Sequence, residues 1–256
     1  MMFQTHIESE SHVPALEAHL LGCVDFEACL TLQRRLVDEA TARDDARITL
    51  LLCEHNPVVT IGRGGRPGQI ASENHMLRSG RIKRLWVARG GGCFVHCPGQ
   101  LAVYPIVPLR WHDYSVGEFV ERLQVAIIET LCDLNISARS SQDKSDICGR
   151  TGRLSMIGIS VRDWVTYFGA YVNVCPSTGL FRLLRPDSID SPADSSLETE
   201  RQGRIRMQQV RATLISRLTE TLGLDRFHLH TGHPYFRGES RTRRLLDDCA
   251  EARARH

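Results

Sequence analysis

The hydrophobic positions of the chain follow two patterns, one of helical period and one of short continuous runs. Over residues 25–43, apolar side chains recur every three or four positions between charged ones, which predicts an amphipathic helix. The same period over 115–135 predicts a second helix, and Ser115 with Glu118 three residues later has the spacing of a capping box at its start. A third helix is expected over 207–222.

The continuous apolar runs predict strands separated by turns rich in glycine or proline. They cover residues 48–53, 57–61, 85–88, 101–108, 154–161 and 165–174, and Arg162-Asp163 between the last two predicts a hairpin. Residues 188–202 are expected to be a polar loop, and 239–256 a solvated helix or tail. With no internal repeat, the order of elements favours a single α/β domain of the α+β type, with a mixed sheet packed by helices.

Composition excludes several classes of protein. The 256 residues are 42% apolar, enough for a sizeable core, but no run approaches the roughly 18 apolar residues that span a bilayer. The polar start has no signal-peptide core, and the nine cysteines are scattered without a CxxC pair. We therefore expect a cytoplasmic protein with no disulfide framework, no zinc ribbon, no bound metal and no cofactor.

The net charge of +2 conceals a segregated pattern. Residues 1–60 have 4 basic and 10 acidic side chains, whereas residues 61–110, here called the basic segment, have 8 basic and 1 acidic. Residues 201–256 are again basic, so an acidic partner is indicated, although solvated arginines explain the pattern equally well. A nucleic-acid-binding module is disfavoured, because acidic segments intervene and no nucleic-acid motif is present.

A glycine-rich loop is the first candidate site. Three glycines, 90–92, follow a predicted strand, so a ligand can approach the backbone closely and its N–H groups can form an anion-binding nest. Because the loop matches neither GxGxxG nor a P-loop, a simple turn is the alternative. Arg89 before the glycines, with His96 and Gln100 after them, favours a site, since a turn needs none of these polar groups.

Read together, an ordered series of motifs resembles the lipoate-protein ligase B family of octanoyltransferases. The motifs are LLLCEHNPVVTIGR at 50–63, RGGGCFVHCPGQ at 89–100, Tyr104-Pro105, Ile157-Gly158 and GAYVN at 169–173. The resemblance implies a biotin/lipoate protein ligase-like fold over a catalytic domain at 25–224, between an N-terminal segment at 1–24 and a charged C-terminal extension at 225–256.

The resemblance also implies a reaction and its partners. Octanoyl, or lipoyl, would pass from acyl carrier protein to a lysine of a lipoyl domain, in 2-oxoacid dehydrogenases or in the glycine cleavage H protein, as part of lipoate biosynthesis. Neither nucleic acid nor a membrane is a partner. The implied substrate-binding residues are Arg89, Gly90, Gly91, Gly92, Cys93, Phe94, Val95, His96, Met156, Ile157, Gly158, Gly169, Ala170 and Tyr171. For Met156 and Tyr171, ordinary core packing is the alternative.

Three positions depart from the family pattern. The position of the family's cysteine nucleophile holds Asp187, that of its lysine holds Arg153, and that of its histidine holds Phe168. Because the family uses these three positions as one site, we expect Asp187, Arg153 and Phe168 to converge beside the glycine loop. Asp187 and Arg153 are therefore the candidate catalytic residues. A carboxylate would give a mixed anhydride and an arginine stays cationic, so the usual covalent mechanism cannot run on them.

Four routes remain open, and direct transfer ranks first. In that route the acceptor lysine attacks the thioester, Asp187 accepts its proton, and Arg153 or the glycine-loop N–H groups hold the oxyanion. A second route moves the nucleophile to Cys93, Cys97 or Cys175, each of which is otherwise a small buried residue. A third, through an acyl-adenylate, needs a lysine, and the chain has two, Lys83 and Lys144. The last is a catalytically impaired paralogue that binds acyl carrier protein or a lipoyl domain.

Overall fold

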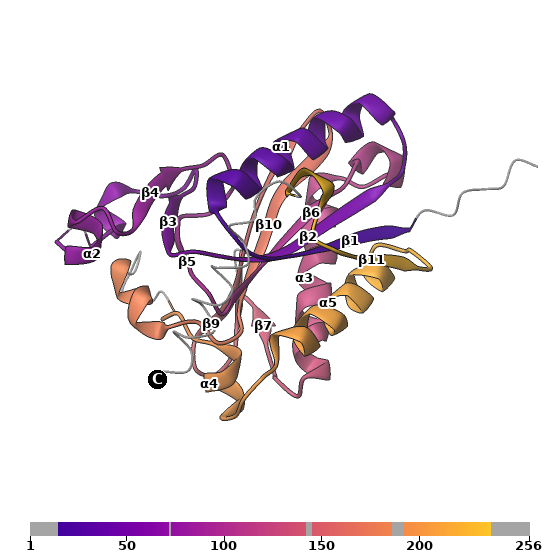
Figure 1. Ribbon diagram of the computed structural model, residues 1–256. Coiled ribbons are helices and arrows are strands. Elements are labelled where there is room, and N and C mark those ends of the chain that lie inside the picture. The colour runs from indigo at the N-terminus through magenta and orange to yellow at the C-terminus, as the bar shows by residue number, and fades with distance from the viewer. Residues whose placement is uncertain (1–14, 72, 142–144, 186–191, 237–256) are drawn as a thin grey trace, which may run out of the picture.

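The computed structural model describes residues 15–71, 73–141, 145–185 and 192–236. Its main element is an eight-stranded mixed sheet in the order β11-β1-β2-β6-β10-β9-β8-β7 (Figure 1). The strands are β1 (Leu16–Val24), β2 (Ile48–His55), β6 (Gln100–Ile106), β7 (Arg139–Ser140), β8 (Asp146–Cys148), β9 (Arg153–Arg162), β10 (Val165–Asn173) and β11 (Phe227–Thr231). β1 is parallel to both β2 and β11, and the other pairs are antiparallel.

A second, three-stranded sheet lies beside the first. Its order is β4 (Lys83–Trp86), β3 (Val58–Ile61), β5 (Cys93–His96). Five α-helices complete the described regular structure, with short 3-10 turns between them: α1 (Phe26–Arg43), α2 (His75–Arg78), α3 (Val116–Asp133), α4 (Leu197–Arg201) and α5 (Met207–Thr221).

The helices cover the two faces of the large sheet (Figure 1). Because successive side chains of a strand point to opposite faces, Leu50 and Leu52 of β2 pack in one cluster with α3 and α5. Leu51 and Cys53 pack in another cluster with α1. Both faces are buried, which explains why β2 reads as a continuous apolar run without alternation.

The three predicted long helices are confirmed, including their starts. Asp25 caps α1 by accepting from the N–H of Ala28, and Ser115 with Glu118 forms the expected capping box of α3. The β9–β10 hairpin is confirmed as well, although its turn residues are Asp163 and Trp164, both with positive φ. The expected fold class, a mixed sheet packed by helices, is confirmed.

The polar loop expected over 188–202 is wrong at its end, where residues 197–201 form α4. The reason is a local cap, because Ser196 accepts from the N–H of Thr199 and starts a turn of helix in a polar sequence. Residues 188–191 of that loop, and the charged stretch 239–256, lie outside the described residues.

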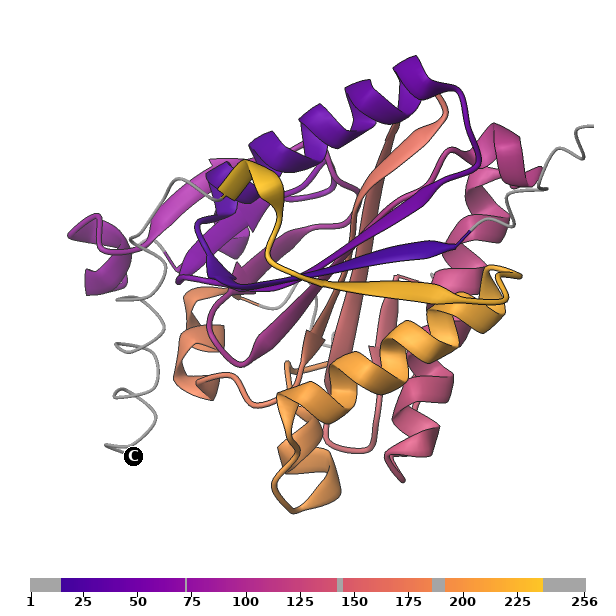
Figure 2. The same ribbon diagram turned by 45° about the vertical axis from the view of Figure 1, so that its right-hand side comes forward.

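Two strands outside the strongest motifs complete the sheet. β1 lies within the N-terminal 24 residues, and β11 pairs with it at the sheet edge, as Figure 2 shows. In the part of the chain that the structure describes, no helix is long and apolar enough to cross a bilayer.

Candidate functional site

The glycine loop is fixed between two layers of backbone. On one side, the N–H groups of Gly62, Arg63 and Gly64 donate to the carbonyls of Gly92, Arg89 and Gly91, each at 3.0 Å. On the other side, the N–H of Gly90 donates to Ile159 O of β9 at 2.9 Å. The loop therefore joins the small sheet to the large one, which a free turn does not do.

Close approach explains the glycines on β9 and β10. Gly158 pairs with Gly169 across the two strands. A Cβ on Gly158 would lie 2.6 Å from Gly90 O, and one on Gly169 would lie 2.1 Å from Val103 O. Backbone packs directly on backbone here, so neither position has room for a side chain.

Most of the predicted substrate-binding residues are brought together. Met156 pairs with Tyr171 and Ile157 with Ala170 across the hairpin, directly beside the glycine pair. The ring centroid of Tyr171 lies 5.7 Å from that of Phe94 and 4.4 Å from that of His96. These contacts leave the substrate-binding roles as predictions. They place Met156 and Tyr171 with Phe94 on one face of the hairpin, and Ile157 and Ala170 on the other.

Arg89 is buried completely and faces the protein. Its Nη1 donates to the carbonyls of Gly90 and Gly92, and its Nη2 donates to Thr60 O and Thr60 Oγ1. The guanidinium carbon lies 3.6 Å from the centroid of the Phe94 ring. Burial lowers the pKa of Arg89 to about 10, so the side chain stays charged and shapes the loop from inside.

A directional chain of hydrogen bonds runs from Arg89 to Asn173. Gln100 donates through Nε2 to Val95 O and Asn173 Oδ1, so its Oε1 accepts from His96 Nδ1 at 2.9 Å. His96 Nε2 then accepts from the hydroxyl of Thr60 at 2.8 Å, and that hydroxyl accepts from Arg89. Every donor and acceptor along the chain thus has one possible orientation.

Burial keeps His96 neutral. Its pKa lies well below the usual 6.5, chiefly because burial penalises the imidazolium and then because of His55 and Arg89 nearby. His96 is therefore fixed in one tautomer and does not exchange protons near neutral pH.

Several donors at this site, Arg89 Nε among them, have no acceptor among the described residues. The N–H groups of Gly91 and Gly92 make no hydrogen bond there, and both residues are partly exposed. Asn173 Nδ2 is buried without an acceptor. Buried or converging donors without partners are typical of a position that a ligand oxygen occupies.

The structure separates two of the residues that depart from the family pattern. Arg153 donates to Asp194 at 2.7 Å and to Asp146 at 3.2 Å. Phe168 pairs with Ile159, six residues further along β9, or about 20 Å at strand rise. The expected convergence of Arg153 and Phe168 is therefore wrong, because both lie on one extended hairpin. Asp187 lies outside the described residues.

The cysteine and lysine alternatives are placed as follows. Cys97 is buried, and burial raises its pKa to about 12, so it remains a thiol. Cys93 is buried and donates to Gln69 Oε1, whereas Cys175 is half-buried beside Gly99. Lys83 is bound to Glu27 at 2.8 Å, and Lys144 lies outside the described residues.

Thr60 and Asn173 were missed as site residues. Each is a polar residue in an otherwise apolar strand, and each is fully buried. A polar residue within a predicted buried strand indicates such a position, because a buried hydroxyl or amide needs a hydrogen-bond partner.

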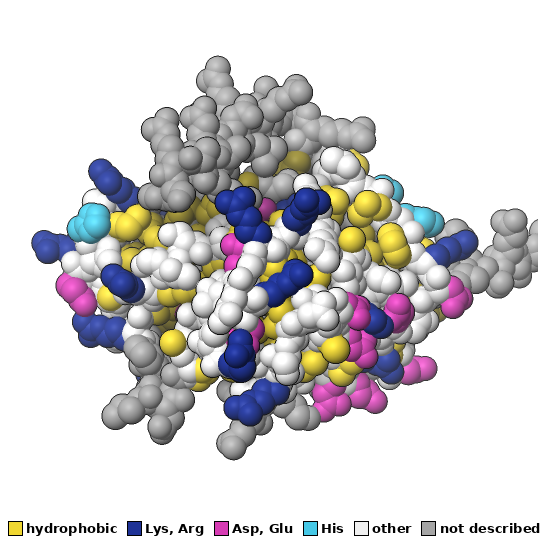
Figure 3. Space-filling model, turned by 90° about the horizontal axis from the view of Figure 1, so that it is seen from below, with side chains coloured by type: hydrophobic (Ala, Val, Ile, Leu, Met, Phe, Trp, Pro, Cys, Tyr) yellow, Lys and Arg dark blue, Asp and Glu magenta, His cyan; other side chains and the backbone are white. Residues whose placement is uncertain are grey.

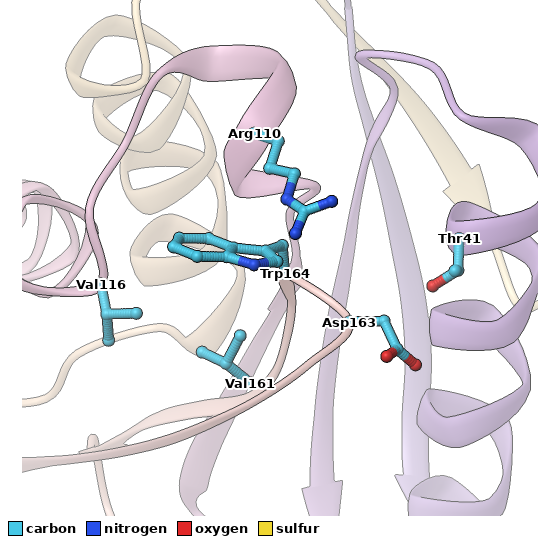
Figure 4. Close-up of a pocket in the computed structure, with 6 residues that line it drawn as sticks. All are labelled: Thr41, Arg110, Val116, Val161, Asp163 and Trp164. Atoms are coloured by element: carbon cyan, nitrogen blue, oxygen red, sulfur yellow. The ribbon is translucent and has the colours of Figure 1, made fainter.

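The exposed arginines of the basic segment and a cavity lie outside this cluster. Figure 3 shows Lys and Arg side chains across the view, several of them on the left around α2 and the small sheet, while most of the Asp and Glu side chains lie toward the right. An open pocket of about 630 Å³ lies at the β9–β10 turn, where Arg110 covers the ring of Trp164 (Figure 4). Thr41, Arg110, Val116, Val161, Asp163 and Trp164 line it, and none is a predicted site residue.

Comparisons with known proteins identify relatives of this chain. The family model described as the lipoyl protein ligase A/B catalytic domain matches residues 25–219. An octanoyltransferase of Pelobacter propionicus is 34% identical, over 77% of this chain and 90% of its own length, and one of Geotalea uraniireducens is 32% identical, over 77% and 88%.

Solved structures share the fold at lower identity. A lipoate-protein ligase A bound with ATP is similar with a TM-score of 0.64 and 22% identity, covering 90% of this chain and 94% of its own. A bi-partite lipoate protein ligase from Thermoplasma acidophilum, studied with its E2 lipoyl domain, has a TM-score of 0.61 and 20% identity, covering 91% and 92%.

Proposed function

Because the chain belongs to the lipoyl protein ligase A/B catalytic domain family, we propose that it is an octanoyltransferase. It takes octanoyl, or lipoyl, from the phosphopantetheine thioester of acyl carrier protein and places it on a lysine of a lipoyl domain, in 2-oxoacid dehydrogenases or the glycine cleavage H protein. The match over residues 25–219 is the observation on which this rests. The cytoplasmic location expected from the scattered cysteines stays a prediction.

We place the acyl group along the β9–β10 hairpin, next to the glycine loop. Met156 and Tyr171 are buried on the α1 face of the hairpin, and Ile157 and Ala170 are buried on its other face. An apolar chain against either pair gains about 0.8 kcal/mol for each buried methylene. Their pairing across the hairpin supports this placement.

We assign the oxyanion to the glycine loop. The N–H groups of Gly91 and Gly92 have no acceptor among the described residues, and the charge of Arg89 lies directly behind them. Arg153 is a weaker candidate, because Asp146 and Asp194 already neutralise its guanidinium.

The chemical step that fits these residues is direct transfer. The acceptor lysine, as a neutral amine, attacks the thioester carbon; the C–N bond forms, the C–S bond breaks, and the amine proton passes to the carboxylate of Asp187 and then to the departing thiolate. The high pKa of Cys97 and the burial of Cys93 disfavour a thiolate nucleophile at either position.

Transfer is tested by incubating the full chain with octanoyl carrier protein and a lipoyl domain, and measuring the mass of both proteins. We expect one octanoyl group on the lipoyl domain and no stable adduct on the enzyme. Cys93→Ala, Cys97→Ala and Cys175→Ala should each retain activity, whereas Asp187→Ala should lose about 10²-fold or more. An octanoyl adduct that disappears in one cysteine variant contradicts direct transfer and identifies the nucleophile.

The second candidate, a binding paralogue without activity, is favoured by the replacement of three family positions. If the wild type transfers nothing, the variant with Asp187→Cys, Arg153→Lys and Phe168→His tests whether only the chemical groups are missing. Phe168 has φ 57°, a conformation that histidine tolerates better than phenylalanine. A covalent octanoyl adduct in this variant supports the binding role, and failure of both proteins to bind octanoyl carrier protein contradicts both candidates.

A further inference from the structure

Two cysteines, a histidine and a tyrosine meet under the first turns of α1. Cys29 lies on α1, Cys53 and His55 on β2, and Tyr104 on β6, and all four are buried. The two sulfur atoms are 3.9 Å apart, and Cys53 Sγ is 3.5 Å from His55 Nε2. The ligating atoms of Cys29, Cys53 and His55 all lie within 4.8 Å of one another.

The tautomer of His55 leaves the lone pair on Nε2, which accepts from the Tyr104 hydroxyl at 2.7 Å and lies 3.5 Å from Cys53 Sγ. His55 Nδ1 lies 2.9 Å from Val24 O, and a carbonyl only accepts, so Nδ1 has the proton. Burial lowers the pKa of His55 to about 4, which keeps the ring neutral. A neutral imidazole that donates its other N–H to a backbone carbonyl is the usual arrangement of a metal-bound histidine.

The distances match a tetrahedral ion. With Zn–S of about 2.3 Å and Zn–N of about 2.0 Å, the edges of a tetrahedron are about 3.8 Å for S–S and about 3.5 Å for S–N. The observed 3.9 and 3.5 Å agree with two of the three edges, and the third, between the ligating atoms of Cys29 and His55, is no longer than 4.8 Å. Tyr104 Oη lies 2.7 Å from His55 Nε2, and as a fourth ligand it would lie about 3.3 Å from that atom.

The charges favour Zn²⁺ over Cu⁺. Two thiolates neutralise a divalent ion, so Zn²⁺ adds no net charge to the apolar cluster around α1, whereas Cu⁺ leaves one negative charge there. Gln33 Nε2 lies 3.8 Å from Cys29 Sγ and supplies a donor to that sulfur, while its Oε1 is fixed by the N–H of Phe168. Because an ion binds cysteine as the thiolate, metal binding at this site releases the thiol protons.

We propose that Cys29, Cys53 and His55 form a buried binding site for a thiolate-preferring d¹⁰ cation, Zn²⁺ or Cu⁺, with Tyr104 at its fourth position. The site joins α1 to β2, and the His55 ring centroid is 6.1 Å from that of His96. It thus stabilises the layer beneath the glycine loop and takes no part in the proposed transfer. Softness of the two sulfurs selects these ions over Mg²⁺ or Ca²⁺.

The test begins with the metal content of the full chain, purified without chelator under reducing conditions. We expect about one equivalent of zinc or copper in the wild type and in Cys132→Ser, whose cysteine is exposed on α3. Cys29→Ser and Cys53→Ser should each retain less than a tenth of it. Zinc and copper are measured separately, which distinguishes the two ions.

Reconstitution with Co²⁺ reports the ligands directly. A tetrahedral site with two thiolates gives intense visible bands and a sulfur-to-cobalt band in the near ultraviolet, and both should vanish in Cys29→Ser. X-ray absorption of the zinc-loaded wild type needs no variant and should show two sulfur scatterers at about 2.3 Å. Only nitrogen or oxygen scatterers, no metal uptake, or a Cys29–Cys53 disulfide that persists under reduction would overturn the proposal.

Discussion

At the scale of residues, the buried arginine of the glycine loop binds backbone carbonyls. Arg89 donates to three carbonyls and one hydroxyl, so its guanidinium fixes Gly90 and Gly92 and polarises the loop. Thr60 connects Arg89 to His96, because its hydroxyl accepts from Arg89 and donates to His96 Nε2.

Replacing Thr60 by valine should therefore destabilise the protein. Valine has the same shape, but it leaves Arg89 Nη2 with one acceptor fewer and His96 Nε2 without a donor, a loss of about 1–3 kcal/mol. The matched control is Thr31→Val on the exposed face of α1, where the hydroxyl bonds only its own helix. Urea unfolding of both variants measures the difference, and equal midpoints would contradict the role of Thr60.

The buried histidines predict a loss of stability at mildly acidic pH. The pKa of His55 is lowered to about 4 and that of His96 lies well below 6.5, both chiefly through burial. The unfolded chain therefore binds more protons, so this stability is complete above about pH 6.5 and is lost as the pH falls towards the folded values.

Between pH 6 and pH 5, each such histidine should lower the free energy of unfolding by roughly 1.4 kcal/mol per pH unit in chelator-treated protein. His19, His112 and His233, whose pKa values are also lowered by burial, act in the same direction. Glu200, with a pKa lowered to about 2, adds stability that is complete above its unfolded pKa near 4.5 and is lost only as the pH falls below that value. Urea midpoints across this range measure the slope; His55→Gln should reduce it and the exposed His75→Gln should not.

At the scale of elements, the site depends on a loop docked on a hairpin without side chains between them. Gly158→Ala should push the glycine loop off β9, since the new Cβ lies 2.6 Å from Gly90 O. We expect at least a tenfold loss of transfer activity and a lower melting temperature. Gly203→Ala, which meets nothing within 4 Å, is the control and should leave both unchanged.

At the scale of the whole molecule, the separation of charge predicts how an acidic carrier protein approaches. Arg66, Arg78, Arg81 and Arg84 of the basic segment are all exposed around α2 and the small sheet. Their field should raise the association rate with acidic proteins at low ionic strength.

Charge reversal at Arg81 and Arg84 should slow association with octanoyl carrier protein and weaken its salt dependence. Arg139→Glu combined with Arg204→Glu, two exposed arginines outside the basic segment, is the matched control for the change of net charge alone. Stopped-flow association rates at several salt concentrations provide the measurement. A variant reversed at Arg81 and Arg84 that associates as fast as this control at low salt would disprove steering by the basic segment.

The sequence by itself determined the long helices, most strands and the position of the glycine loop. Periodicity and caps are local, so residues such as Asp25, Ser115 and Glu118 specify their elements without knowledge of the rest of the chain. The glycine loop was likewise visible as an ordered motif next to a strand.

Only the tertiary structure decided which side chains meet. The sequence could not show that the donors of Arg89 bind Thr60 and the loop itself, or that Arg153 and Phe168 lie far apart on a hairpin. Cys29 and Cys53 are 24 positions apart and give no metal-binding spacing, yet α1 folds over β2 and brings their sulfurs to 3.9 Å. Contacts between distant segments depend on sheet order and helix packing, which local patterns do not encode.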